Sequence, residues 1–255
     1  MGFQLEGKRV VITGAGGGVG QCLVNAFHSA GADVIACDRD AALLDALPEG
    51  STKEKHTFEL SVPEAVESAA KQIGAADVLV NNAGFTSAET ISQLNADSVR
   101  KEIDGNLIGT INLTRALIPA MTEKGGGTIV TVSSVNGLGH YGNPAYAAAK
   151  AGVLAFMRAV AVECGGKGIR ANAVCPGTML TPAWKHRIEQ TPDIMDTLVK
   201  HYPSNRIILP QEVANVVLFL ASPLSSGITG VDLPVDGGLS AGNLSLLKDL
   251  VSSFE

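Results

Sequence analysis

A tyrosine and a lysine stand four residues apart, at Tyr146 and Lys150. On a helix, residues i and i+4 share one face, so the phenol and the ammonium are expected one turn apart. A free phenol, with a pKa of about 10, is a poor base at neutral pH, but a neighbouring cation together with the positively charged ring of an oxidised cofactor stabilises the phenolate and lowers that pKa. The spacing therefore predicts a phenol that takes or returns the proton of a reacting hydroxyl, although an exposed Tyr/Lys pair has the same pattern.

A serine precedes this pair by 12 residues: Ser134 follows the apolar run TIVTVS. A hydroxyl at the carboxyl end of a strand is placed to hydrogen-bond the reacting oxygen of a substrate. Ser133 is the alternative. Because side chains alternate along a strand, the two serines are expected to point in opposite directions, and only one of them to serve.

Eight residues near the N-terminus, TGAGGGVG at 13–20, form a glycine-rich turn after an expected strand and before an expected helix. Gly14, Gly18 and Gly20 lack a Cβ, so the backbone N–H groups can approach a pyrophosphate. The positive end of the helix dipole favours the same anion. The turn predicts a nucleotide site, and an ordinary glycine-rich loop is the alternative.

An acidic residue, Asp38, ends the next expected strand, 24 residues after Gly14. A carboxylate at this place accepts both hydroxyls of an adenosine ribose and repels a 2′-phosphate. Asp38 therefore favours NAD over NADP. Arg39 opposes this inference, because a guanidinium accommodates a phosphate.

These residues need a scaffold that places them together, and short apolar runs alternate with helix-period segments along all 255 residues. Runs such as VVIT and VLVN are apolar on both faces, as in parallel strands that helices cover on two sides. The alternation predicts a single-domain, doubly wound, Rossmann-like parallel sheet of seven strands, with the ligand at the carboxyl ends. Strands are expected at 9–13, 33–38, 56–60, 77–81, 128–133, 170–174 and 231–235, and helical stretches near 17–30, 40–47, 62–73, 96–121, 145–164 and 211–221.

Two segments depart from the alternation. Residues 182–205 are long, mixed in polarity and flanked by prolines, which predicts a substrate lid. Residues 242–255 form a C-terminal extension with an amphipathic stretch, which covers either a partner subunit or its own domain.

Composition excludes several classes of function. The net charge is −6 and no basic patch stands out, so no nucleic-acid partner is expected. No 18-residue apolar run and no leader pattern occur, so neither a membrane span nor export is expected. The cysteines form no CxxC and the histidines are scattered, which predicts no metal site and buried thiols in a reducing cytoplasm.

Together these features resemble the short-chain dehydrogenase/reductase family over residues 1–241. Further stretches carry the likeness: NNAG at 81–84, an asparagine in DGNLIGT, PGTMLT at 176–181, ITG at 228–230 and VDGG at 235–238. The resemblance implies a catalytic tetrad of Asn106, Ser134, Tyr146 and Lys150. It implies cofactor contacts by Gly14, Gly18, Val19, Gly20, Asp38, Arg39, Leu60, Asn82, Ala83, Gly84, Tyr146, Lys150, Pro176, Gly177, Met179 and Thr181.

This chain departs from the family pattern at three places. Glu59-Leu60 stands where relatives often have Asp-Val, and the Ser-to-Tyr spacing is one residue shorter than in many relatives, so a tight loop is expected at 139–144. The extension past Gly242 is longer than usual, and in tetrameric relatives this end lies near a subunit interface. The likeness therefore implies a cytoplasmic homotetramer or homodimer.

The leading hypothesis is an NAD-dependent short-chain alcohol dehydrogenase or carbonyl reductase that acts on CH–OH groups. Substrate choice is expected at 85–87, 136–143 and 179–205, which are polar and partly cationic, so we expect a sugar, polyol or hydroxy acid. The expected substrate contacts are Asn136, His140, Tyr141, Trp184 and His186. The alternatives are a 3-oxoacyl-thioester reductase that uses NADPH and a non-catalytic, cofactor-sensing regulator; a regulator would tend to lose the tetrad.

Overall fold

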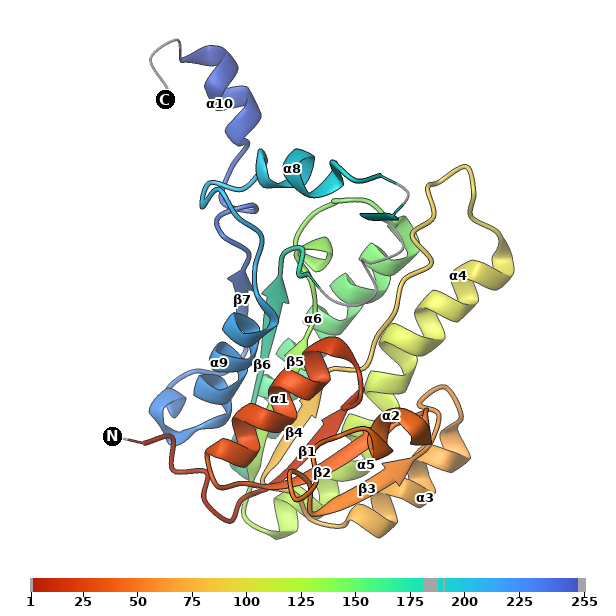
Figure 1. Ribbon diagram of the computed structural model, residues 1–255. Helices are drawn as coiled ribbons and strands as arrows, with labels where there is room; N and C mark the ends of the chain where they lie inside the picture. The colour runs from red at the N-terminus through yellow and green to blue at the C-terminus, as the bar shows by residue number, and fades with distance from the viewer. Residues whose placement is uncertain (1, 181–187, 190, 252–255) are drawn as a thin grey trace.

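A seven-stranded parallel sheet forms the centre of the protein (Figure 1). The computed structural model describes residues 2–180, 188–189 and 191–251. The strands lie side by side in the order β3-β2-β1-β4-β5-β6-β7, and each neighbouring pair is parallel. This confirms the predicted doubly wound sheet. The strands are β1 (Arg9–Thr13), β2 (Asp33–Asp38), β3 (Glu54–Thr57), β4 (Val78–Asn81), β5 (Gly127–Val132), β6 (Ile169–Pro176) and β7 (Asp232–Val235).

Helices cover both faces of the sheet. On one face lie α1 (Gly18–Ser29) and α9 (Pro210–Ala221), whose buried residues share one core with β1. On the other face lie α3 (Pro63–Ile73), α5 (Gly109–Glu123) and α6 (Pro144–Cys164), which form the second core. The remaining helices are α2 (Ala41–Asp45), α4 (Ala96–Ile103), α8 (Ile194–Val199) and α10 (Leu244–Leu250).

The strand β1 shows why the runs are apolar throughout. Val10 and Ile12 belong to the core under α1 and α9, whereas Val11 between them belongs to the opposite core. All three are fully buried. Since each such side chain stabilises the fold by about 1.5–3 kcal/mol, both helical layers depend on the same strand.

Two predicted elements differ from the observed ones. The third strand, expected at 56–60, runs over Glu54–Thr57 because its backbone pairs with β2 in the register Ile35↔Glu54 to Asp38↔Thr57. This edge strand has no continuous apolar run to mark it. The long helical stretch at 96–121 is divided by a π-helical turn, Asp104–Ile108, between α4 and α5. The strands expected at 9–13 and 33–38 match β1 and β2, and the boundaries of the remaining strands shift by one or two residues, the usual uncertainty at element ends.

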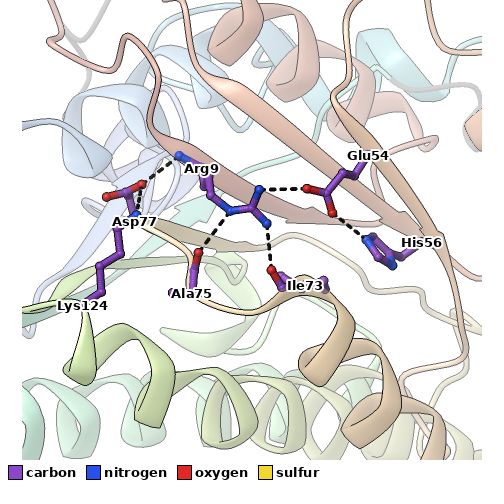
Figure 2. A network of polar contacts seen from close by, with 7 residues as sticks. All are labelled: Arg9, Glu54, His56, Ile73, Ala75, Asp77 and Lys124. Atoms are coloured by element: carbon purple, nitrogen blue, oxygen red, sulfur yellow. Dashed lines mark hydrogen bonds and ion pairs between the residues drawn. The ribbon is translucent and has the colours of Figure 1, made fainter.

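A polar network holds the amino ends of the strands, opposite the end where a ligand is expected (Figure 2). The Arg9 guanidinium donates to a carboxylate oxygen of Glu54 at 2.8 Å and to the carbonyls of Ile73 and Ala75. Asp77 accepts from the backbone N–H of Arg9 at 2.9 Å and from Lys124. The network therefore links β1, β3, α3, the start of β4 and the end of α5.

The helix α6, with the turn after it, is long and apolar enough to cross a membrane by length and composition alone. Its buried residues, which include Val153, Leu154 and Met157, pack in the core beside β5 and β6. Core helices commonly have this composition, and the packing explains it here.

Candidate functional site

A cavity of about 600 Å³ lies at the carboxyl ends of β1, β2, β4 and β5. This is the crevice where open α/β sheets bind ligands, because the strand order reverses between β1 and β4. Many of the residues predicted to contact a cofactor line it: Gly14, Gly18, Val19, Gly20, Asp38, Arg39, Leu60, Asn82, Ala83, Gly84, Tyr146, Lys150 and Met179. Pro176 and Gly177 stand outside this lining, at the end of β6 and just after it. Thr181 lies outside the described residues.

The glycine turn forms one wall of the cavity. Gly14 has a φ of +61°, and a Cβ on it would lie 2.9 Å from the Cα of Ala83. A Cβ on Gly20 would lie 2.0 Å from the carbonyl oxygen of Gly14. The helix α1 begins at Gly18 with no side-chain cap, and the residues of its first turn line the cavity. Uncapped N–H groups at the start of a helix favour an anion. This arrangement fits the pyrophosphate of a dinucleotide.

The end of β4 is fastened to this turn by Asn82. Its amide nitrogen donates to the carbonyls of Thr13 and Gly14 at 3.0 and 3.1 Å. In return, the Thr13 hydroxyl accepts from the backbone N–H groups of Asn82 and Ala83, both at 3.0 Å. The NNAG segment is thus held along the cavity by hydrogen bonds between two neighbouring strand ends.

Asp38 is fixed at the rim of the same cavity. One carboxylate oxygen accepts from the N–H of Gly16 at 3.0 Å, and the other from the N–H of Asp40 at 3.2 Å. Both bonds orient an acceptor-only group beside the turn. The neighbouring Arg39 is mostly exposed, and its guanidinium lies 3.9 Å from the carboxylate of Glu59.

Tyr146 and Lys150 lie one turn apart at the start of α6, as their spacing predicts, and both line the cavity. Pro144 opens the helix directly after Asn143, which has a φ of 55°. The Nζ atom of Lys150 lies 5.5 Å from the centre of the Tyr146 ring and donates to the carbonyl of Val132 at 3.1 Å. The tight turn at Asn143 therefore brings the pair to the end of β5.

Burial dominates the electrostatics of this pair. Burial raises the pKa of Tyr146 to about 12, although a hydrogen bond with Ser134 lowers it. Burial also lowers the pKa of Lys150 to about 8. In the chain alone, the loss of hydration therefore favours the protonated phenol. The predicted lowering of the phenol's pKa, which depends on the charge of an oxidised cofactor as well as on the ammonium, stays a prediction.

The two serines take different partners, as strand alternation predicts. The Ser133 hydroxyl is buried and donates to the carbonyl of Lys150 at 3.2 Å, although part of the residue lines the cavity. Ser134 hydrogen-bonds the Tyr146 side chain, and its oxygen also accepts from the N–H of Asn136 at 3.2 Å. Ser134 is therefore the serine associated with the phenol.

Asn106 is fully buried within the π-helical turn rather than on the cavity surface. Its side-chain oxygen accepts from the N–H of Phe85 at 3.1 Å, and its amide nitrogen donates to the carbonyl of Phe85 at 2.9 Å. A Cβ on Gly84 would lie 2.9 Å from this oxygen and 3.1 Å from the Nζ atom of Lys150. Only a glycine leaves room where the asparagine, the lysine and the NNAG segment meet.

The predicted substrate contacts are less well assembled. Asn136 accepts from the N–H of Tyr141 at 2.9 Å, which closes the loop after β5. Asn136, His140 and Tyr141 are absent from the cavity lining, and the latter two are exposed. Trp184 and His186 lie outside the described residues.

Sequence reasoning missed some side chains at this site. Leu43 and Phe58 line the cavity near Asp38. Glu102 is buried against Asn106. Leu43 had no signal beyond lying soon after the second expected strand, and Phe58 fell within the strand expected at 56–60, which gave no indication of a cavity. A charged residue one helical turn before Asn106 was visible, but its burial was not.

Comparisons with known proteins agree with this geometry. The profile of a family described as Enoyl-(Acyl carrier protein) reductase matches residues 14–240. An uncharacterized oxidoreductase of Schizosaccharomyces pombe is 40% identical, over 97% of this chain and 96% of its own length. The 3-oxoacyl-[acyl-carrier-protein] reductase of Thermotoga maritima is also 40% identical, over 93% of this chain and 99% of its own.

Solved structures are similar over nearly the whole chain. An oxidoreductase of the short chain dehydrogenase/reductase family from Burkholderia thailandensis has a TM-score of 0.92 and 40% identity, over 97% of this chain and 98% of its own. L-sorbose reductase from Gluconobacter frateurii, complexed with NADPH and L-sorbose, has a TM-score of 0.90 and 27% identity, over 95% of this chain and 100% of its own.

Proposed function

Since this chain belongs to the short-chain dehydrogenase/reductase family, we propose that it is an NAD-dependent alcohol dehydrogenase or carbonyl reductase. The family's oxidoreductases act on alcohol and ketone groups with a nicotinamide cofactor. One observation carries the proposal: Tyr146 and Lys150 line the same cavity as the glycine turn and Asp38. A proton-transfer pair and a dinucleotide cradle thus share one space.

The chain's own residues fit the cofactor at both ends. The uncapped first turn of α1 takes the pyrophosphate, and Asp38, oriented by the N–H of Gly16, accepts the hydroxyls of the adenosine ribose. At the other end Lys150 holds the nicotinamide ribose, and Gly84 leaves space beside it. Asn82 and Ala83 line the path between them. By the family resemblance, Pro176, Gly177, Met179 and Thr181 would hold the carboxamide, and Met179 lines the cavity.

When bound, a nicotinamide ring supplies the acceptance or donation of a hydride at a carbinol carbon. Tyr146 would ionise more readily beside the positive charge of an oxidised ring, because burial is the main cause that raises the pKa of the phenol to about 12. As a phenolate, Tyr146 takes the proton of the substrate hydroxyl, and as a phenol it returns the proton to a carbonyl. Ser134, which hydrogen-bonds Tyr146, also holds the substrate oxygen.

Lys150 and Asn106 complete the tetrad in supporting roles. The ammonium lies beside the Tyr146 ring and keeps its position through the carbonyl of Val132. Asn106, in the π-helical turn, keeps the backbone after NNAG in place, and by the family resemblance its helix would hold a water that leads to the lysine. Four residues from three separate stretches thus serve one proton path.

A small hydroxylated or anionic molecule is the proposed substrate: a sugar, polyol or hydroxy acid. The polar loop around Asn136, His140 and Tyr141 supports this class, as does the sugar bound by the Gluconobacter relative. The segment 182–205, with Trp184 and His186, is proposed as the lid.

A 3-oxoacyl-thioester reductase is the second candidate, because the Thermotoga relative carries that activity at 40% identity. The Gluconobacter relative binds NADPH, whereas Asp38 in this chain opposes a 2′-phosphate. A regulator without catalysis is disfavoured by the presence of the whole tetrad.

We further propose a cytoplasmic, single-domain protein that assembles as a homotetramer or homodimer. The C-terminal α10 extends away from the body (Figure 1), and Leu246, Leu247 and Leu250 are 52%, 42% and 72% exposed. Such leucines favour the partner-facing alternative for this extension. A chain ended at Gly242 is expected to show a smaller assembly by sedimentation.

One experiment tests the function directly. Reduction of NAD⁺ and of NADP⁺ is measured with a panel of sugars, polyols, hydroxy acids and steroids, and the reverse reaction with a 3-oxoacyl thioester. Turnover with NAD⁺ and a hydroxylated compound is expected, and Tyr146→Phe should lower it by about 10²–10⁴-fold while NADH still binds. Turnover with NADPH and the thioester alone supports the second candidate, and unchanged turnover in Y146F overturns the role of the phenol.

A further inference from the structure

A buried acidic residue, Glu102, lies behind the tetrad and has no part in the chemistry described above. Glu102 is 2% exposed and lies on the last turn of α4, just before the π-helical turn. Taking a carboxylate out of water is costly unless hydrogen bonds and charges compensate it. A buried Glu in a short helix whose other residues are mostly exposed therefore needs a physical explanation.

The carboxylate has two hydrogen-bond partners, and both are donors. One oxygen accepts from the backbone N–H of Ser87. The other accepts from the amide nitrogen of Asn106 at 2.9 Å. Neither of these donor groups can accept a hydrogen bond. A carboxylate, which only accepts, therefore matches both partners, whereas the O–H of a protonated carboxyl would face donors alone.

These bonds fix two parts of the active site at once. Asn106 also holds both the N–H and the carbonyl of Phe85, so Glu102 and Asn106 together clamp the segment Phe85–Ser87. This segment follows Gly84 directly, and Phe85 and Thr86 line the cavity. The clamp therefore sets the wall against which a substrate beside Lys150 would rest.

The carboxylate also lies near the proton-transfer pair, because it is hydrogen-bonded to Asn106, whose side-chain oxygen and the Nζ atom of Lys150 both approach Gly84. Burial raises the pKa of Tyr146, and Glu102 raises it further. Burial lowers the pKa of Lys150, whereas Cys175 and then Glu102 oppose that shift. The neighbouring elements carry further titratable groups. These are Cys175 at the end of β6, Asp104 in the π-helical turn and Lys101, whose Nζ atom lies 5.4 Å from the Phe85 ring centre. In the described part of the chain, no carboxylate lies within 4.0 Å of the Lys150 ammonium.

We propose that Glu102 is a positioning residue of this site: its carboxylate anchors Asn106 and Phe85–Ser87, and through Asn106 it fixes a negative charge beside the Tyr146–Lys150 pair. The inference rests on the proposed roles of Tyr146 and Lys150. Its consequence is that Glu102 sets the pH at which the phenol becomes available as a base.

The test follows the phenolate of Tyr146 by its ultraviolet absorbance in the full chain with saturating NAD⁺. The chain has three tyrosines, so subtraction of the Y146F titration isolates this phenol. Glu102→Gln removes the charge, and the midpoint is expected to move to lower pH by about one unit. Glu102→Asp keeps the charge on a shorter side chain, so its midpoint should stay near that of the wild type while the rate of NAD⁺ reduction falls.

Two further variants keep the result interpretable. Glu102→Met is a second uncharged side chain of similar length, for use where Gln, facing two donors, fails to fold. Asp97→Asn removes an exposed charge from the same helix and should leave the midpoint unchanged. An unmoved midpoint in E102Q or E102M, with only a lower melting temperature, would overturn the inference and leave Glu102 a structural residue.

The outcome is separable from the proposed function. If Y146F retains turnover, the function assigned to the phenol fails, whatever Glu102 does. If Y146F is inactive and the uncharged variants titrate like the wild type, only the role of Glu102 fails.

Discussion

The ammonium of Lys150 donates to the carbonyl of Val132, 3.1 Å away, at the end of the central strand β5. The next residue, Ser133, donates its hydroxyl to the carbonyl of Lys150 at 3.2 Å. These reciprocal bonds join α6 to β5 on both sides of one peptide. The lysine is thereby held beside Tyr146, and these bonds offset the rotamer entropy, up to about 2 kcal/mol, that its long side chain loses when it is fixed.

Replacing Lys150 should therefore affect both binding and chemistry. Lys150→Met keeps an apolar stem but removes the charge beside the phenol, so the pKa of Tyr146 should rise further and turnover should fall by about 10²-fold or more. The affinity for NADH, measured by fluorescence titration, should fall as well, because the ribose loses a donor. Lys167→Met changes an exposed lysine beyond α6 and should leave both quantities unchanged.

Asp38 should decide the choice of cofactor. Asp38→Ala removes the charge that faces a 2′-phosphate, so the ratio of kcat/KM for NAD⁺ to that for NADP⁺ is expected to fall by about tenfold or more. Asp45→Ala removes an equal charge from the exposed side of α2 and serves as the matched control. An unaltered ratio in D38A would show that another group, such as Arg39, selects the cofactor.

The parts of the site that are local in sequence could be predicted, since a few adjacent residues determine them. The glycine turn lies between one strand and one helix, and Tyr146 and Lys150 share one helical turn. The alternation of Ser133 and Ser134 also follows from the geometry of one strand.

The parts that depend on tertiary packing could not be predicted. Glu102 looks like a surface residue in sequence, and its burial requires the 85–87 segment to fold over it. The third strand was misplaced because its bounds come from pairing with β2, not from its own apolar pattern. The burial that raises the pKa of Tyr146 could not be predicted either, because the loss of hydration in the cavity is a property of the whole fold.

A methyl group on Gly20 should disrupt the cofactor cradle. Its Cβ would lie 2.0 Å from the Gly14 carbonyl and 2.7 Å from that of Ala15, so Gly20→Ala must displace backbone. We expect about 1–3 kcal/mol of destabilisation in urea unfolding and loss of NADH binding. Gly165→Ala, with no atom within 4 Å of the new Cβ, should stay within about 0.5 kcal/mol of the wild type. Wild-type affinity in G20A would contradict a cradle formed by this turn.

The polar network at the amino ends of the strands should make stability depend on pH in the acid range (Figure 2). A hydrogen bond with His56 and the contact with Arg9 lower the pKa of Glu54, despite its partial burial. A lowered carboxyl pKa means that the folded state favours the ionised form. The contribution of Glu54 is therefore complete above the unfolded pKa, about 4.3, and is lost as the pH falls through the lower folded pKa.

Glu54→Gln is accordingly expected to destabilise the protein at pH 7 by about 1 kcal/mol or less, because the pair is partly exposed. The difference from the wild type should vanish in acid, where both side chains are neutral. Urea unfolding of the two proteins at neutral and at acid pH measures this directly. Glu49→Gln changes an exposed residue that makes no side-chain hydrogen bond or ion pair within the described part of the chain, and should change stability at neither pH. A deficit of E54Q that persisted in acid would assign the effect to side-chain packing instead of charge.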